Sequence, residues 1–185
     1  MLSGRTGGRT VDEWPRLPIL VCRTQPGMSH PLTRRDVEAM IVLLRPVSIY
    51  GVKSVQLRPE PAIRAEGIVF GEYALSGDIS LYALPTADWT LPYLLAPGDV
   101  AAFRRYGAKL EIDLDRDVTH VHWPPGRLKS YCLYEVLAHE LGHHAVQRRR
   151  GVAGRAVCRR KDHEALAELY SRRALQATKE RTICE

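Results

Sequence analysis

The chain has 185 residues, of which 45% are hydrophobic and 26% are charged, and this length and balance are typical of a soluble globular domain with a core of its own. It has no apolar run of the about 18 residues that a membrane-spanning helix needs, and its N-terminus lacks the hydrophobic segment of a secretory signal. We therefore expect a cytoplasmic protein with no membrane partner, in which residues 1–12 are a disordered lead-in and residues 13–185 fold as a single domain.

The first half of the chain predicts one helix and then strands. Thr33 and Asp36 are spaced as a helix-capping pair in front of apolar residues at helical intervals, so we expect a helix that ends before Pro46. Alternation of polar and apolar side chains then predicts three strands, the last two joined as a β-hairpin through Ser76-Gly77: residues 54–58, 67–75 and 78–84. Residues 85–127, rich in Pro and Gly, predict a loop-rich insertion.

The segment 128–147 carries the motif H-E-x-x-H at His139, Glu140 and His143. Its apolar residues form one stripe at helical spacing: Leu133, Tyr134, Leu137, Leu141 and Ala145. Positions four apart lie on the same face of a helix, so both imidazoles can bind one metal ion. Glu140 lies about 100° further round the helix, where it can contact a water molecule at the metal without being a ligand. Imidazole ligands, an open position and a neighbouring base are what a catalytic zinc site needs.

A second helix, predicted from residue 162 onward, offers a third ligand. Glu164 could bind the metal, and Glu168, one turn further on the same face, could accept the remaining N–H of a ligand histidine. His163 is the competing ligand, but adjacent residues point about 100° apart on a helix, so only one of the two can serve. Because Glu168 shares a face with Glu164, we favour Glu164. Gly142, between the two histidines, is a place where another backbone could pack closely.

The motif H-E-L-G-H-H, followed by E-x-x-x-E on the next helix, resembles the zincins, in particular the gluzincins, in which a downstream Glu completes the site. The order of helix, strand, hairpin and metal-binding helix is similar to the minigluzincins, and residues 164–171 resemble a signature of ImmA/IrrE-type peptidases. Glu168 is a departure, because the gluzincins usually have Asp there.

This resemblance implies an α+β, zincin-like fold: a small mixed or antiparallel sheet packed on the H-E-x-x-H helix and the following helix. It implies one Zn²⁺ per chain and a metallopeptidase, a hydrolase in which Glu140 is first general base and then general acid. It also implies that strand 78–84 lies beside the cleft and pairs with a peptide substrate. Tyr170, Tyr131 or a histidine could stabilise the developing oxyanion.

Two alternatives remain open. With His163 as third ligand, the chain would be nearer to the SprT-like peptidases, which act on DNA-bound proteins, and the basic stretch 148–161 could contact nucleic acid; we favour a solvated loop for that stretch. The second alternative is a non-catalytic zinc-binding interaction module. Glu140 argues against it, because a structural site needs no base and is normally closed by four protein ligands.

Overall fold

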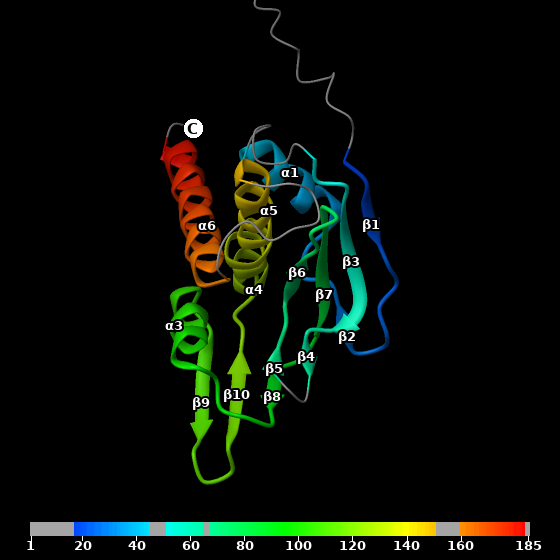
Figure 1. Ribbon diagram of the computed structural model, residues 1–185. Coiled ribbons are helices and arrows are strands. Elements are labelled where there is room, and N and C mark those ends of the chain that lie inside the picture. Colours follow the sequence, from blue (N-terminus) through cyan, green and yellow to red (C-terminus); the bar gives the residue numbers. More distant parts are fainter. Residues whose placement is uncertain (1–16, 45–50, 65–66, 151–159, 184–185) are drawn as a thin grey trace, which may run out of the picture.

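A five-stranded mixed β-sheet forms one layer of the structure, and the helices α4, α5 and α6 lie on one side of it (Figure 1). This computed structural model describes residues 17–44, 51–64, 67–150 and 160–183, and it has a mixed α+β fold. The disordered lead-in expected at residues 1–12 and most of the basic stretch 148–161 lie outside the described residues. No helix in the described ranges is long and apolar enough to cross a membrane.

The two longest strands, β3 (Ser54–Pro61) and β7 (Asp78–Pro85), form the centre of the sheet and run parallel to each other. On β7, Ile79 and Leu81 are buried while Ser80 and Tyr82 are only half-buried, as the alternation of side chains predicts for a sheet with one covered face. Three shorter strands complete the sheet: β1 (Ile19–Val21) parallel to β3, and β2 (Met28–Ser29) and β6 (Gly71–Tyr73) antiparallel to β7.

The strand β6 is an edge strand, and this corrects the expectation that strand 78–84 pairs with substrate. Between Ile79 and Leu81, β7 is paired on one edge with β3 and on the other with β6. The N–H of Tyr82 donates to the carbonyl of Phe70 at 2.9 Å. In an antiparallel pair only every second residue of a strand, counted here from Phe70, directs its N–H and C=O groups at the partner strand. The peptide groups of Gly71 and Tyr73 therefore face away from β7, toward the metal-binding helix.

The hairpin between β6 and β7 forms as the sequence predicts. Gly77 has a φ of +101°, and a Cβ atom there would lie 2.8 Å from the carbonyl oxygen of Gly51. Only glycine accepts both the conformation and the contact without strain.

The first helix, α1 (Arg34–Leu44), ends before Pro46 and begins with the predicted capping pair. The Thr33 backbone N–H donates to Asp36 Oδ2 at 2.8 Å, and the Asp36 N–H donates to Thr33 Oγ1 at 3.3 Å. Asp36 also forms an ion pair with Lys129 of α4 (Arg127–Tyr131). Burial alone would raise the pKa of Asp36, but the hydrogen bonds from Lys129 and Thr33 outweigh it and lower the pKa below its usual value.

Replacing Asp36 with Ala should lower the free energy of unfolding by about 1–2 kcal/mol near neutral pH, because both the cap and the contact with Lys129 are lost. A carboxylate with a lowered folded pKa stabilises the protein above its unfolded pKa and loses this effect as the pH falls through the folded value. The difference measured by urea unfolding should therefore be present at pH 6 and shrink below about pH 4. Glu38→Ala, at an exposed position of the same helix, is the control; an equal loss in both variants would contradict a specific cap.

The segment 85–127 was expected to be a loop-rich insertion with a short helix at 101–106, a strand at 109–115 and a possible strand at 120–122. The structure has a helix and two strands near these positions and one further strand. Three strands form an antiparallel sheet in the order β8-β10-β9, and a helix precedes β9: β8 (Trp89–Leu91), α3 (Pro97–Arg105), β9 (Lys109–Asp113) and β10 (Val118–His122). This part forms the lower end of the molecule in Figure 1. The ring of Phe103 contacts Trp89, Phe70 and Tyr131, with centroids 5.3–6.1 Å apart. One continuous core therefore joins this sheet to the main sheet and the metal-binding helix.

The helix that carries H-E-x-x-H is preceded by a π-helical turn. α4 continues into η2 (Cys132–Leu137), a π-helix, and then into α5 (Ala138–Arg150). A π-helical turn adds a residue to the helical repeat and is frequent at functional sites. It changes which residues face the core: Tyr131 and Cys132 are buried, whereas Leu133 and Tyr134 of the predicted stripe are half-buried.

Candidate metal centre

Two imidazoles from α5 and one carboxylate from α6 (Arg160–Ile183) converge at the surface of the helix pair. His139 and His143 lie one turn apart, with ring centroids 4.5 Å from each other. Glu164 Oε2 lies 3.2 Å from His139 Nε2 and 3.6 Å from His143 Nε2. The three groups can offer one ligand atom each, all within 4.8 Å of one another, so this cluster could hold a metal ion.

The donors and their spacing fit zinc. Zinc binds imidazole nitrogen and carboxylate oxygen at about 2.0–2.2 Å, which places tetrahedral ligand atoms about 3.3 Å apart. Both separations between an imidazole and Glu164 are close to this value. Burial and the neighbouring His139 lower the pKa of His143 to about 4, so this imidazole is neutral near pH 7, the form that binds metal.

Gly142 allows α6 to approach α5 closely enough for Glu164 to reach the histidines. A Cβ atom on Gly142 would lie 2.8 Å from Ala167 Cα, 2.8 Å from Tyr170 Cβ and 2.9 Å from the carbonyl oxygen of Ala167. Side chains do not pack this closely, and two of these three atoms belong to the α6 backbone. The close packing of a second backbone at Gly142, expected from the sequence, is confirmed.

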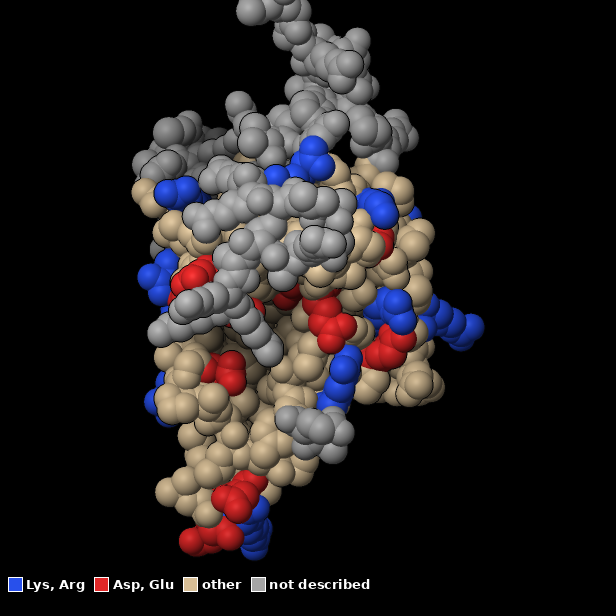
Figure 2. Space-filling view, in the orientation of Figure 1, with Lys and Arg blue, Asp and Glu red and all other residues tan. Residues whose placement is uncertain are grey.

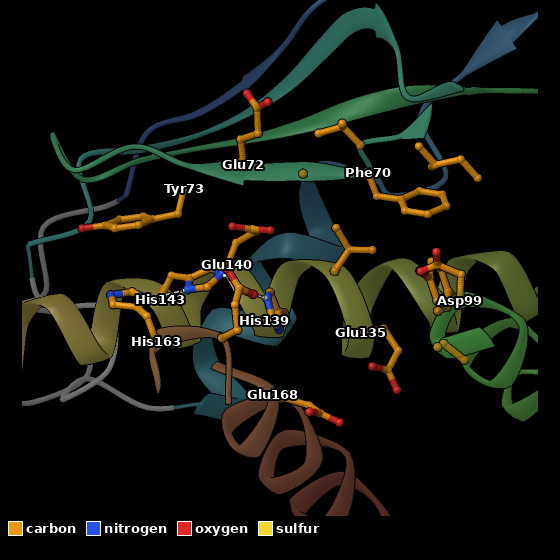
Figure 3. Close-up of a pocket in the computed structure, with 18 of the residues that line it drawn as sticks. Phe70, Glu72, Tyr73, Asp99, Glu135, His139, Glu140, His143, His163 and Glu168 are labelled. Atoms are coloured by element: carbon orange, nitrogen blue, oxygen red, sulfur yellow. Dashed lines mark hydrogen bonds and ion pairs between the residues drawn. The ribbon is translucent and has the colours of Figure 1, made fainter. Parts of the chain in front are cut away.

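Glu140 points from α5 toward β6 (Figure 3). It is 8% exposed, and its carboxylate accepts a hydrogen bond from the backbone N–H of Tyr73. Burial raises the pKa of Glu140 to about 8, and the negative charges of Glu164 and Glu72 contribute, although the Tyr73 N–H opposes the shift. A buried carboxylate of raised pKa beside a possible metal site is suited to taking up a proton.

His163 does not join the cluster of ligand atoms; it lies beside His143. The two Nδ1 atoms are 2.7 Å apart, and the rings lie edge to edge with centroids 4.9 Å apart and 23° between their planes. Burial is the main cause that lowers the pKa of His163 below its usual value. The adjacent residues His163 and Glu164 therefore contact different nitrogens of the same imidazole.

Glu168 and Tyr170 are not where the sequence placed them. Glu168 lines the same cleft but forms an ion pair with Arg172 on the next turn of α6, and it makes no hydrogen bond to a histidine within the described part of the chain. Tyr170 packs against Gly142 at the helix crossing and is not among the residues that line the cleft. Tyr131 does line it but is 6% exposed, within the aromatic core. The expected tautomer partner and oxyanion donor are therefore not provided by these three residues in this structure.

Tyr73 is a cleft residue that sequence reasoning missed. Its backbone N–H contacts Glu140, and its ring packs on His144 with centroids 5.6 Å apart. Its place on the hairpin was predicted, but nothing in the sequence indicated that this strand, rather than β7, would lie over the metal-binding helix.

The cleft in front of the cluster is large and carries mainly negative charge. Its volume is about 1340 Å³, more than the about 300–1,000 Å³ of small-molecule pockets. Figure 2 shows the acidic residues around the hollow in the middle of this face. The carboxylates that line it come from β6, α3, the helical run of η2 and α5, and α6: Glu72, Asp99, Glu135, Glu140, Glu164 and Glu168. Among the described lining residues Arg105 is the one Lys or Arg, and it is paired with Glu135 at 2.7 Å.

The chain was also compared with protein-family models, curated proteins and solved structures, and none of them matches it. The resemblance to the zincins therefore rests on the motif and on the residues around it. What the protein does must be inferred from the chemistry of the cleft.

Proposed function

We propose that this protein is a zinc-dependent peptidase with a zincin-like architecture, in which His139, His143 and Glu164 bind the metal and Glu140 is the general base. The observation that carries the proposal is the position of Glu140. It is a buried carboxylate on the same helix as the two histidines, and it lines the cleft on the side of β6 (Figure 3). A site that only held a metal would have no use for it.

In the proposed hydrolysis the metal and the cleft residues have separate roles. When bound, zinc supplies a Lewis acid that makes water nucleophilic near neutral pH and polarises a substrate carbonyl. Glu140 accepts the proton of the attacking water and returns it to the departing amine nitrogen. The Tyr73 N–H and the walls of the cleft hold the carboxylate in place between these two transfers. The burial that raises its pKa also makes it the stronger base.

The edge of β6 is the proposed docking edge for the substrate. The N–H and carbonyl of Gly71 and the carbonyl of Tyr73 face the cleft, whereas the Tyr73 N–H is bonded to Glu140. An extended peptide can add to such an edge by backbone hydrogen bonds to the remaining groups. An antiparallel arrangement is the more stable pairing. Carboxylates that line the cleft favour peptides with Lys or Arg over acidic peptides.

The two alternatives have less support. A peptidase of SprT type needs His163 as a ligand, but His163 lies against the Nδ1 side of His143. The described lining of the cleft is acidic and would repel nucleic-acid phosphates. A non-catalytic module is disfavoured by the open cleft, where Glu164 is 50% exposed, because structural zinc sites are closed.

The test is whether metal and hydrolysis are lost and restored together. We expect about one zinc per chain and cleavage of an unfolded protein rich in Lys and Arg. Chelation should abolish this cleavage and added zinc should restore it. His143→Ala and Glu164→Ala should lose both the metal and the activity. His120→Ala, at an exposed position of β10 that is bonded to Thr90, should keep both.

Cleavage by fully metal-free protein would rule the proposal out. Stoichiometric zinc without cleavage of any substrate in a peptide library would favour the non-catalytic module.

A further inference from the structure

His143 is held from both sides by two consecutive residues of α6. Its Nε2 lies 3.6 Å from the carboxylate of Glu164, on the side of the metal cluster. Its Nδ1 lies 2.7 Å from Nδ1 of His163. Both side chains come from the first turns of α6, and the close crossing at Gly142 sets their distance from α5.

The hydrogen bond between the two histidines can have only one direction when metal is bound. A neutral imidazole carries one proton, and a ring that binds metal through Nε2 must carry it on Nδ1. His143 therefore donates its Nδ1–H, and His163 must accept at its own Nδ1. An imidazole that accepts at Nδ1 carries its proton on Nε2. In this arrangement His163 cannot use Nδ1 as a metal ligand.

We propose that His163 is the positioning residue of the metal centre: it accepts the Nδ1–H of His143 and so fixes the tautomer and ring orientation that present Nε2 to zinc. Metal-binding histidines usually have such a partner, most often a carboxylate, a carbonyl or water. The sequence assigned this role to Glu168, whose carboxylate pairs with Arg172 instead. The ring planes lie within 23° of each other, the near-coplanar arrangement that suits a hydrogen bond between two ring nitrogens.

This inference rests on the metal binding within the proposed function and does not depend on peptide hydrolysis. Its readout is the dissociation constant for zinc, measured by competition with a chromophoric chelator. His163→Ala should keep one site per chain but weaken zinc binding about 10- to 100-fold. His163→Asn should recover most of the affinity, because the amide oxygen can accept near the position of Nδ1. Glu168→Gln should change the affinity by less than about threefold, since Glu168 touches no ligand.

Three outcomes would overturn it. Equal zinc affinity in the wild type and His163→Ala would show that His163 has no role, and would leave the proposed peptidase intact. Complete loss of zinc in both His163 variants, with metal-free thermal unfolding unchanged, would make His163 a ligand. A wild-type protein that binds no zinc would overturn this inference and the proposed function together. If the wild type and the variants bound zinc in the expected order of affinity but the wild type cleaved no peptide, the role of His163 would be supported and the proposed peptidase activity refuted.

Discussion

Replacing Glu140 with Gln should reduce peptide hydrolysis about 10²- to 10⁴-fold and leave zinc binding in place. The amide has the shape of the carboxylate but cannot accept a proton near neutral pH. Its oxygen can still accept the N–H of Tyr73, so the local structure should be kept. Because Glu140 is not one of the three proposed ligands, the zinc content should stay at about one per chain. The measurements are cleavage rates and metal analysis on the same preparations.

The matched control is Glu135→Gln. Glu135 lies on the same helical run, lines the same cleft and loses the same charge in the variant, but its partner is Arg105. We expect Glu135→Gln to change the rate of peptide cleavage only slightly. If Glu140→Gln retained wild-type activity, another group would have to be the base. Loss of zinc from that variant would instead make Glu140 a ligand.

Glu140→Gln should have a second effect, on the stability of the metal-free protein. A buried carboxyl group whose pKa is raised to about 8 is destabilising once the pH exceeds its unfolded pKa, and the loss grows until the folded pKa is reached. Metal-free Glu140→Gln should therefore unfold at a higher temperature than the metal-free wild type at pH 8, and the difference should vanish near pH 4. Bound zinc should reduce it, because the cation favours the ionised carboxylate.

The part of the site that lies within one helix could be predicted from the sequence. The spacing of His139, Glu140 and His143 fixes their relative directions through the helical repeat, whatever the rest of the fold does. The capping pair of α1 and the turn at Gly77 could be predicted for the same reason, because each depends on a few consecutive residues. Glu164 is favoured as third ligand because Glu168 shares its helix face, although in the structure Glu168 pairs with Arg172.

The relations between elements could not be predicted in this way. Which residue of α6 faces which nitrogen of His143 depends on the rotation of α6 about its own axis. His163 and Glu168 are five residues apart and point about 140° from each other round the helix, so the rotation of α6 decides which of them faces His143. In the sheet, hairpin periodicity predicts that β6 and β7 pair, but only the long-range parallel pairing of β3 with β7 leaves β6 at the edge.

The π-helical turn is a further feature without a clear sequence signal. It adds a residue between two helical segments whose apolar spacing can be fitted by an uninterrupted α-helix. The stripe predicted for residues 128–147 is buried at Leu137, Leu141 and Ala145, whereas Leu133 and Tyr134, within the turn, are only partly buried against the core.

The crossing of α5 and α6 should be the most sensitive structural position near the site. Gly142→Ala would improve intrinsic helix propensity by about 1 kcal/mol. The new methyl group, however, would lie 2.8 Å from the Cα atom of Ala167, and a backbone atom cannot move away as the end of a flexible side chain can. Overpacking of this kind costs about 1–3 kcal/mol. α6 must move outward, and Glu164, one turn before Ala167, moves with it.

We therefore expect Gly142→Ala to lower the thermal unfolding temperature and to weaken zinc binding by at least about tenfold, a change of about 1.4 kcal/mol. The control is Gly98→Ala in α3, where a Cβ atom would meet nothing within 4 Å; it should be neutral or stabilising by up to about 1 kcal/mol. If Gly142→Ala were as stable as Gly98→Ala and bound zinc as tightly as the wild type, α6 could shift without displacing Glu164. The close crossing would then not be what holds the carboxylate within reach of the two histidines.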